Sequence, residues 1–233
     1  MFFDFHINGD YKLALEAYRI GYNGIALIQS SKNYKKDFFN DFKQIKPDFE
    51  VFSGVEIYAK NKEGLRKNIQ KFRENEDVLI VNGGNLKVNR AACEDPRIDI
   101  LAHPFKKRRD SGINHILAKK AAENEVAIEL SIDPILKTKY SLRAKLISHF
   151  RQIIKMHRKF GFPIIISSNA YSIYDLRKPN DIISLTRCFG MSEQEAGNSL
   201  SKIPLNIIER NKIRKGIIVK GARIIKDNGG ECE

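Results

Sequence analysis

The sequence predicts an α/β fold in which about seven parallel strands form a TIM-like (β/α) barrel with its helices outside. Short apolar runs rich in Ile, Val and Phe recur along the chain, and a longer segment with helical spacing of apolar residues follows each of them. Connections of this length favour parallel neighbours. Polar residues also collect where the apolar runs end, as they do at the mouth of a barrel. A chain of 233 residues is an ordinary length for one such domain.

The expected elements follow this alternation. We expect strands at Phe2 to Ile7, Gly24 to Gln29, Val51 to Ile57, Val78 to Val81, Ile98 to Ala102, Val126 to Leu130 and Pro163 to Ser167. We expect the intervening helices at Tyr11 to Ile20, Lys35 to Ile45, Lys62 to Glu74, Leu86 to Ala92, Asn114 to Asn124 and Leu142 to Phe160. An open doubly wound sheet would also fit this alternation. However, Gly9 alone follows the first strand, so the glycine-rich fingerprint of a dinucleotide-binding sheet is missing.

The pattern changes after the seventh run. Ser172 to Arg187 and Ser192 to Ser201 have helical spacing with no convincing strand between them, so an eighth strand stays open. Ser192 and Glu195 have the spacing of a capping box. We expect a last helix at Leu205 to Arg210 to end a single barrel domain over residues 1–211. Residues 212–233 are expected to form a flexible tail, first basic and then acidic.

The charge balance favours a polyanionic partner. The chain has 41 Lys and Arg against 28 Asp and Glu, a formal net charge of +13. Nucleic acid and an anionic membrane surface are both consistent with this excess, and so is a lysine-rich surface that only confers solubility. A hydrophobic fraction of 42% and a charged fraction of 30% are typical of a soluble globular protein.

Cysteine usage and the first residues indicate a cytoplasmic protein. Cys93, Cys188 and Cys232 are odd in number and far apart, which fits a reduced compartment better than a disulfide framework or a zinc cluster. The first ten residues have no basic leader and include Asp4, so we expect neither a signal peptide nor a membrane anchor.

Polar residues at four strand ends form a candidate site. Asp4, His6 and Asn8 share one face of the first strand if side chains alternate with a period of two. Glu56 ends the third strand and His103 follows the fifth. Ser167 to Tyr171 end the seventh and include Asn169.

These four segments resemble, in the same order, those of the polymerase and histidinol phosphatase (PHP) superfamily of metal-dependent phosphoesterases. The superfamily motifs read His-x-His, Gly-x-Glu, Ala-His-Pro and Ser-Asp-Ala-His. By this resemblance, ligand positions are kept by His6, Glu56 and His103 and are substituted by Asn8, Asn169 and Tyr171. Amide and phenol groups are poor substitutes for carboxylates and imidazoles around several divalent cations. We therefore interpret the six positions as a vestigial metal site with no catalytic residue. The sequence leaves open whether this site holds a single metal ion weakly.

Nearly the whole chain also resembles the ribonuclease P protein component 3 family, the barrel-shaped subunits of archaeal and eukaryotic ribonuclease P. The similarity is most specific in Ser167 to Pro179, SSNAYSIYDLRKP, and extends to Leu13 to Gln29 with Gly21, Tyr22 and Gly24. It implies a subunit that binds the catalytic RNA, works with a small companion subunit, and assists removal of the 5′ leader from precursor tRNA. The chain alone would not be catalytic. Magnesium would serve the ribonucleoprotein, and this chain would bind no cofactor. A metal-dependent phosphoesterase and an adaptor that binds only protein are the alternatives.

Cations near the strand ends are the candidate RNA ligands. Four adjacent cations directly follow the Ala-His-Pro segment, and others follow the fourth and seventh strands. Arginine and lysine contact phosphates, and a neighbouring histidine can donate to one. The candidate RNA-binding residues are Arg90, Lys106, Lys107, Arg108, Arg109, His115, Arg177 and Lys178. Local salt bridges stay an alternative for the arginines. No interleaved aromatic pattern indicates base reading, and we interpret the cations of Leu142 to Phe160 as part of an amphipathic cover for the barrel.

Overall fold

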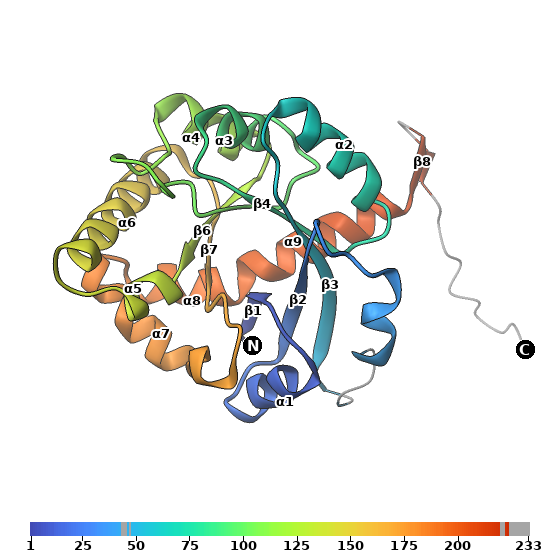
Figure 1. Cartoon of the computed structure of the whole chain (residues 1–233), viewed down its shortest axis with the longest axis horizontal. Coiled ribbons are helices and arrows are strands. Elements are labelled where there is room, and N and C mark those ends of the chain that lie inside the picture. The colour runs from blue at the N-terminus through green and yellow to red at the C-terminus, as the bar shows by residue number, and fades with distance from the viewer. Residues whose placement is uncertain (43–45, 47, 220–221, 224–233) are drawn as a thin grey trace, which may run out of the picture.

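Seven parallel strands in sequential order form a nearly closed barrel in the computed structural model, as the sequence predicts (Figure 1). The structure describes residues 1–42, 46, 48–219 and 222–223. The strands are β1 (Phe3–Ile7), β2 (Gly24–Ser30), β3 (Glu50–Ile57), β4 (Val78–Asn82), β5 (Ile100–Ala102), β6 (Ala127–Ser131) and β7 (Ile164–Ser167).

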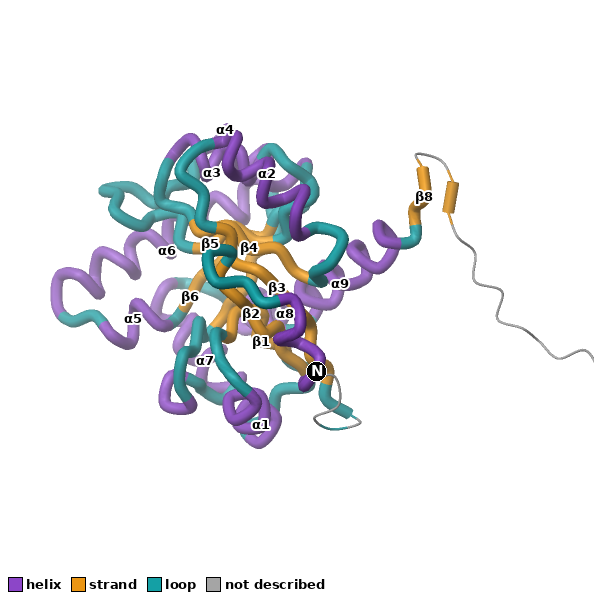
Figure 2. The backbone as a smooth tube through the Cα atoms, turned by 45° about the vertical axis from the view of Figure 1, so that its right-hand side comes forward, coloured by secondary structure: helices purple, strands orange, loops and turns teal. Residues whose placement is uncertain are grey.

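Helices surround the strands (Figure 2). They are α1 (Tyr11–Arg19), α2 (Lys62–Phe72), α3 (Leu86–Cys93), α4 (His115–Glu123), α5 (Asp133–Lys137), α6 (Tyr140–Phe160), α7 (Pro179–Thr186), α8 (Glu193–Leu200) and α9 (Lys202–Lys215). Short 3₁₀ helices are η1 (Lys36–Phe42), η2 (Ile173–Asp175) and η3 (Arg187–Phe189). Strands β8 (Ile217–Val219) and β9 (Ala222–Arg223) pair antiparallel in a separate two-stranded sheet. None of the described helices has both the length and the apolar character that a membrane crossing requires.

The barrel closes where β7 meets β1. Ile7 and Ala170 form an isolated parallel bridge, and the backbone N–H of Asn8 donates to the Ala170 carbonyl at 2.8 Å. The Asp4 carboxylate adds a contact, because it accepts from the Ser168 amide at 3.0 Å. Within the described ranges no eighth strand lies between β1 and β7, since β8 pairs only with β9.

A bulge in β1 decides which way its polar side chains point. Asp4 pairs with Ile25 and Ile7 with Leu27, so β1 has one more residue than β2 between these pairs. The predicted shared face is therefore wrong for Asp4, which lies beside Ile25 on the side that packs against the helices. The extra residue turns His6 into the barrel.

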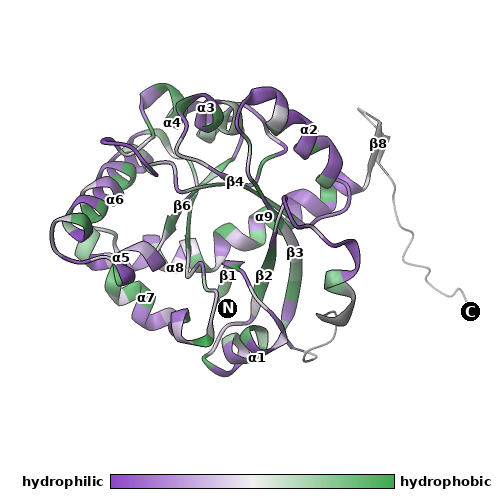
Figure 3. Cartoon of the chain, viewed as in Figure 1, coloured by the Kyte–Doolittle hydropathy of each residue, from purple (hydrophilic) through white to green (hydrophobic). Residues whose placement is uncertain are grey.

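Two apolar layers make up the core. The outer layer packs strands against helices, and the polar faces of the helices point outward (Figure 3). The inner layer fills the barrel, with Phe3, Phe5 and Phe52 in ring contact. Ile207 and Ile208 of α9 join this inner layer, so α9 plugs one end of the barrel.

A buried carboxylate fixes α9 across the N-terminal ends of the strands. Asp99 is fully buried and accepts from Arg73 at 2.6 Å, from Arg210 at 3.0 Å and from Asn211 at 2.9 Å. It also accepts from the Leu79 amide at 2.8 Å, so it joins β4, α2 and α9. A buried charge is tolerated only when it is paired and hydrogen-bonded in this way.

Several predicted helices change at their ends. The segment Ser172 to Arg187 is wrong as one helix, because Pro179 cannot continue a preceding helix and instead begins α7 after η2. The segment Lys35 to Ile45 is the 3₁₀ helix η1 up to Phe42, and residues 43–45 lie outside the described residues. Helix α5 was not predicted. The Ser192 and Glu195 capping box is confirmed.

The last helix is longer than predicted. It runs over Lys202–Lys215, so the first four residues of the expected tail are helical. Cations in its last turn favour the helix dipole, and Lys215 pairs with Asp77 at 2.9 Å. Residues 212–215, which we expected to begin a basic tail, therefore form the last turn of α9 and attach it to the barrel. Residues 220–221 and 224–233 lie outside the described residues.

Replacing Asp99 with Asn is expected to lower the free energy of unfolding by about 3–5 kcal/mol, because buried Arg73 would lose its counter-charge. Urea unfolding measures the change. As a control, Glu16→Gln removes an exposed pair with Arg19 and should leave stability nearly unaltered. Equal losses in both variants would contradict the role assigned to Asp99.

Candidate functional site

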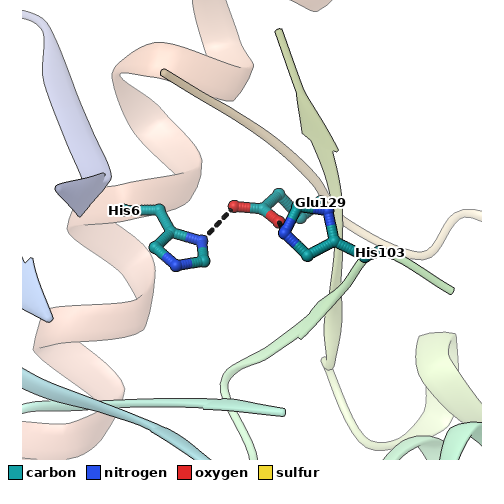
Figure 4. A group of neighbouring side chains, drawn as sticks. All are labelled: His6, His103 and Glu129. Atoms are coloured by element: carbon teal, nitrogen blue, oxygen red, sulfur yellow. Dashed lines mark hydrogen bonds and ion pairs between the residues drawn. The ribbon is translucent and has the colours of Figure 1, made fainter. Parts of the chain in front are cut away.

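Three buried side chains from separate strands meet at the mouth of the barrel (Figure 4). His6 comes from β1, Glu129 from β6, and His103 from the residue after β5. Nδ1 of His6 lies 2.6 Å from Oε1 of Glu129, and Nε2 of His103 lies 3.9 Å from Oε2. Both His6 and Glu129 are only 1% exposed. The arrangement is a buried ion pair with a second imidazole beside it.

Left-handed backbone turns aim two of the mouth side chains. His103 has a φ of 49° and Asn169 a φ of 50°, in a region that residues other than glycine seldom adopt. Ala102 already points into the barrel, so regular alternation would turn His103 outward to the helices. The positive φ redirects its imidazole toward Glu129. Such strain is typical of positions whose side-chain direction is fixed by their surroundings.

Electrostatics keep the pair ionised. Burial alone would lower the pKa of His6, but attraction to Glu129 and the hydrogen bond between them outweigh it and raise that pKa to about 9. Burial likewise opposes ionisation of Glu129, yet His6 lowers its pKa to about 2. The pKa of His103 is lowered, chiefly by burial. At neutral pH the mouth therefore holds a His6 imidazolium, a Glu129 carboxylate and a neutral His103.

The remaining polar positions bond to one another. Glu56 accepts from Asn82 at 2.5 Å and from the Tyr58 hydroxyl. Asn8 donates to the Asn169 side chain at 2.8 Å. These bonds satisfy Glu56, Asn8 and Asn169, which are three of the positions that the sequence resemblance to the PHP superfamily singles out. Among the described mouth residues, Nε2 of His6 and Oε2 of Glu129 are the buried atoms of the ion pair that have no hydrogen-bond partner.

The residues present do not fit a centre of two or three metal ions. Among the described residues, His6, His103 and Glu129 form one group of three whose ligand atoms lie within 4.8 Å of one another. A cation there would bind Nε2 of His6 in place of its proton, beside Oε2 of Glu129, because both atoms are buried without a hydrogen-bond partner. Asn8 and Asn169 offer amides that are bonded to each other, and Tyr171 is 58% exposed. The carboxylates needed to balance several cations are missing from this group.

Sequence reasoning missed the central acid of the mouth. Glu129 accepts from the Ser167 hydroxyl at 2.6 Å as well as pairing with His6. The available signal was a lone carboxylate inside the apolar run Val126 to Leu130. An acid buried in a strand requires a partner, so it marks a polar site.

The predicted basic run lies on the loop between β5 and α4. Lys106 reaches the mouth, where its ammonium lies 3.4 Å from the Asn82 side chain. Arg108 makes two bonds to the Asp110 carboxylate, at 2.6 and 2.8 Å. Lys107 and Arg109 are exposed. The run therefore presents cations both at the mouth and outside it.

A buried amide holds this loop in place. The Asn89 side chain on α3 donates to the carbonyls of Pro104, at 2.9 Å, and Gly112, at 3.2 Å, and accepts from the Gly84 amide at 2.9 Å. Gly112 has a φ of 74°, and a Cβ there would lie 2.0 Å from the Pro104 carbonyl oxygen. Only glycine permits this close approach. The basic run thus sits on a fastened loop.

The other predicted cations are spread around the same end of the barrel. Arg90 on α3 pairs with Glu94 at 2.7 Å and lies in a groove with α2. His115 is the exposed first residue of α4. Arg177 turns back onto the carbonyls of residues 174 and 176, and Lys178 is exposed. All follow the C-terminal ends of strands, but they do not form one cluster.

These features define a (β/α) barrel whose mouth is filled by its own polar side chains and whose surrounding loops and helices carry exposed cations. The family described as RNase P subunit p30 matches residues 1–216. Ribonuclease P protein component 3 of Methanothermobacter thermautotrophicus is 45% identical, with 97% of this chain and 96% of that protein covered. The Methanosarcina barkeri protein of the same name is 40% identical, covering 93% and 89%. The chain therefore belongs to the RNase P subunit p30 family.

Solved structures agree with this fold. A chain in the cryo-EM structure of archaeal ribonuclease P with mature tRNA has a TM-score of 0.83 and 30% identity, and covers 97% of this chain and 100% of its own. Histidinol phosphate phosphatase from Lactococcus lactis has a TM-score of 0.52 and 10% identity, and covers 90% and 93%. At that identity the likeness shows a shared barrel fold alone.

The His6 imidazole should titrate near pH 9 in the folded protein, and in Glu129→Gln its pKa should fall below the usual 6.5 because burial then acts without the carboxylate. NMR titration of the ring protons measures this. A raised pKa in the folded state adds stability that is complete below pH 6.5 and is lost as pH rises to about 9. The wild-type free energy of unfolding should therefore drop across that range. Glu123→Gln, at an exposed site, should keep the same profile.

Asn89→Ala is expected to lower the free energy of unfolding by about 1–3 kcal/mol, because buried carbonyls of the loop lose their donor. It should also expose the run from Lys106 to Arg109 to trypsin. Limited proteolysis with identification of the cut sites tests this. The matched variant Asn75→Ala, whose side chain bonds only the Lys71 carbonyl at the surface, should be cut like the wild type.

Proposed function

We propose that this chain is the ribonuclease P subunit that binds the catalytic RNA and assists removal of the 5′ leader from precursor tRNA. The observation that carries this is the pairing of a mouth closed by its own ion pair with a basic loop held beside it. Membership of the RNase P subunit p30 family supports the assignment, as does the similarity to a chain of archaeal ribonuclease P. The ribonucleoprotein is the tRNA-maturing endonuclease, and its RNA performs the hydrolysis.

The proposed RNA contacts are to the phosphate backbone. Arg108 illustrates the kind of contact proposed, because its guanidinium donates to both oxygens of the Asp110 carboxylate. A phosphate offers the same two-oxygen geometry as that carboxylate. The partners on the rim are Arg90, Lys106, Lys107, Arg108, Arg109, His115, Arg177 and Lys178, which supply charge and position without reading bases.

The remaining assignments follow from the same proposal. We place the chain in the cytoplasm together with precursor tRNA and the other ribonuclease P protein subunits, among them a small companion subunit. Magnesium belongs to the ribonucleoprotein, where it would neutralise RNA phosphates, and this chain contributes no ligand to it. The metal-dependent phosphoesterase is not proposed, because the mouth residues do not fit a multinuclear centre.

Arg90→Ala, Arg108→Ala and Arg177→Ala, tested singly, should each lower the tRNA-processing rate of the reconstituted ribonucleoprotein severalfold at 0.15 M salt. Each change removes a cation from the rim without touching the core. Multiple-turnover cleavage of precursor tRNA measures the rate, and circular dichroism checks the fold. Arg66→Ala on the outer face of α2 serves as the control and should process at the wild-type rate. Wild-type rates in all three rim variants would refute the assignment of these residues.

A second experiment addresses catalysis by the isolated chain. The purified protein with manganese or magnesium and a generic phosphodiester should show no turnover, yet should stimulate the complex on reconstitution. Turnover that disappears in His6→Ala or His103→Ala would overturn the proposal in favour of a phosphoesterase.

A further inference from the structure

Helix α6 has an unusual charge composition for the cover of a barrel. It has six cations and no acid, and the sequence from residue 134 to residue 174 contains neither Asp nor Glu. Arg151, Lys155 and Lys159 follow one another at intervals of four, where like charges repel. An amphipathic cover requires only polar residues on its outer face and gains stability when acids alternate with the cations. The helix instead tolerates repulsion along its outer side.

The three arginines of α6 are engaged in hydrogen bonds within the protein, and the Lys159 ammonium lies 5.5 Å from the centre of the Phe160 ring. Arg158 makes two bonds to Glu195 at 2.7 and 2.8 Å, Arg151 donates to the Cys188 carbonyl at 2.9 Å, and Arg143 donates to the Thr138 carbonyl at 2.8 Å. The three lysines differ. In the described part of the chain, Lys145, Lys155 and Lys159 make no ion pair, and all three are exposed.

These lysines lie along one line of the helix. Lys145, Gln152 and Lys159 are seven residues apart, which is two turns, and Lys155 adjoins the same line. The opposite side carries the buried residues that pack on the barrel, among them Phe150 and Ile153. At 1.5 Å per residue, Lys145 and Lys159 are about 21 Å apart along the axis. We call Lys145, Gln152, Lys155 and Lys159 the α6 track.

The track is continuous with the basic loop after β5. Gln152, Lys155 and Lys159 line one wall of a groove whose other wall includes Arg108 and Asn114. The loop and α6 are fastened together nearby, because the His149 ring lies 3.3 Å from the Arg109 carbonyl and Phe105 contacts the rings of His149 and Phe150. Figure 1 shows α6 on the side of the barrel away from α2. Charge therefore extends from the rim down this side.

We propose that the α6 track binds the phosphodiester backbone of RNA and extends the contact made by the loop from Lys106 to Arg109. This rests on the proposed function and adds a second RNA surface to it. A line about 21 Å long suits a chain of phosphates better than a single anion. A protein partner fits less well, because lysine is depleted at protein interfaces and the exposed Tyr140 and Leu142 of α6 lie at its start, away from Lys155 and Lys159.

The test is the triple variant Lys145→Gln, Lys155→Gln, Lys159→Gln in the full chain. With labelled ribonuclease P RNA as the probe, its affinity at 0.15 M salt should fall about tenfold. The slope of log affinity against log salt should become shallower by about 2 to 3. Because the change removes like-charge repulsion, the melting temperature should stay the same or rise. Lys12→Gln, Lys36→Gln and Lys67→Gln together, on α1, η1 and α2, remove equal charge and should keep the wild-type slope.

The outcomes separate this inference from the proposed function. If Lys106→Gln with Lys107→Gln weakens RNA binding but the track variant does not, the track is refuted and the proposed function stands. Equal losses in the control triple would show a general charge effect and also refute the track. Wild-type protein without salt-dependent RNA affinity would refute both proposals. Polyglutamate that competes as well as the RNA at equal charge would point to an acidic protein and overturn the assignment to RNA.

Discussion

The buried ion pair between His6 and Glu129 decides what the mouth of this barrel can do. Removing two charges from water is costly, and here the cost is offset by a contact of 2.6 Å and a further bond from Ser167. Once formed, the pair fills the barrel mouth beside His103. The neighbouring amides of Asn8 and Asn169 then bond to each other. The two acids of the mouth, Glu56 and Glu129, are each held by hydrogen bonds within the described residues, and the atoms left without a hydrogen-bond partner are Oε2 of Glu129 and Nε2 of His6.

Closing the mouth moves the functional surface outward. The loop after β5 contributes His103 to the interior of the mouth and the basic run from Lys106 to Arg109 to its rim. The left-handed turn at His103 points the imidazole inward, and the cations that follow lie outside. Asn89 and Gly112 then fix the loop against α3, so its cations have a defined position relative to the barrel. A cation held in place loses less entropy when it binds a phosphate than one on a mobile loop.

The alternation of apolar runs and helical segments predicts all seven strands, because both periodicities are local properties of the chain. Local pattern does not contain the β1 bulge, which arises from pairing with β2 and turns His6 inward. It also does not show that Asp99, Arg73 and Arg210 meet, since they come from three distant segments. For the same reason Glu129 escaped the candidate site while His6 and His103 did not. The two histidines belong to recognisable motifs, whereas Glu129 gains its meaning only from the strands around it.

Both ends of the barrel are therefore committed to structure. Ile207 and Ile208 of α9 fill the N-terminal end, and the His6 ion pair fills the C-terminal end. The charge that such a protein offers to a partner then comes from the rim of the mouth and from the outer surface, and it is greatest where cations have no carboxylate neighbour. Arg90, Arg108 and Arg158 each have a carboxylate neighbour, so part of their charge is balanced. The lysines of α6 have none in the described chain, and their mutual repulsion is a cost that a polyanion would relieve.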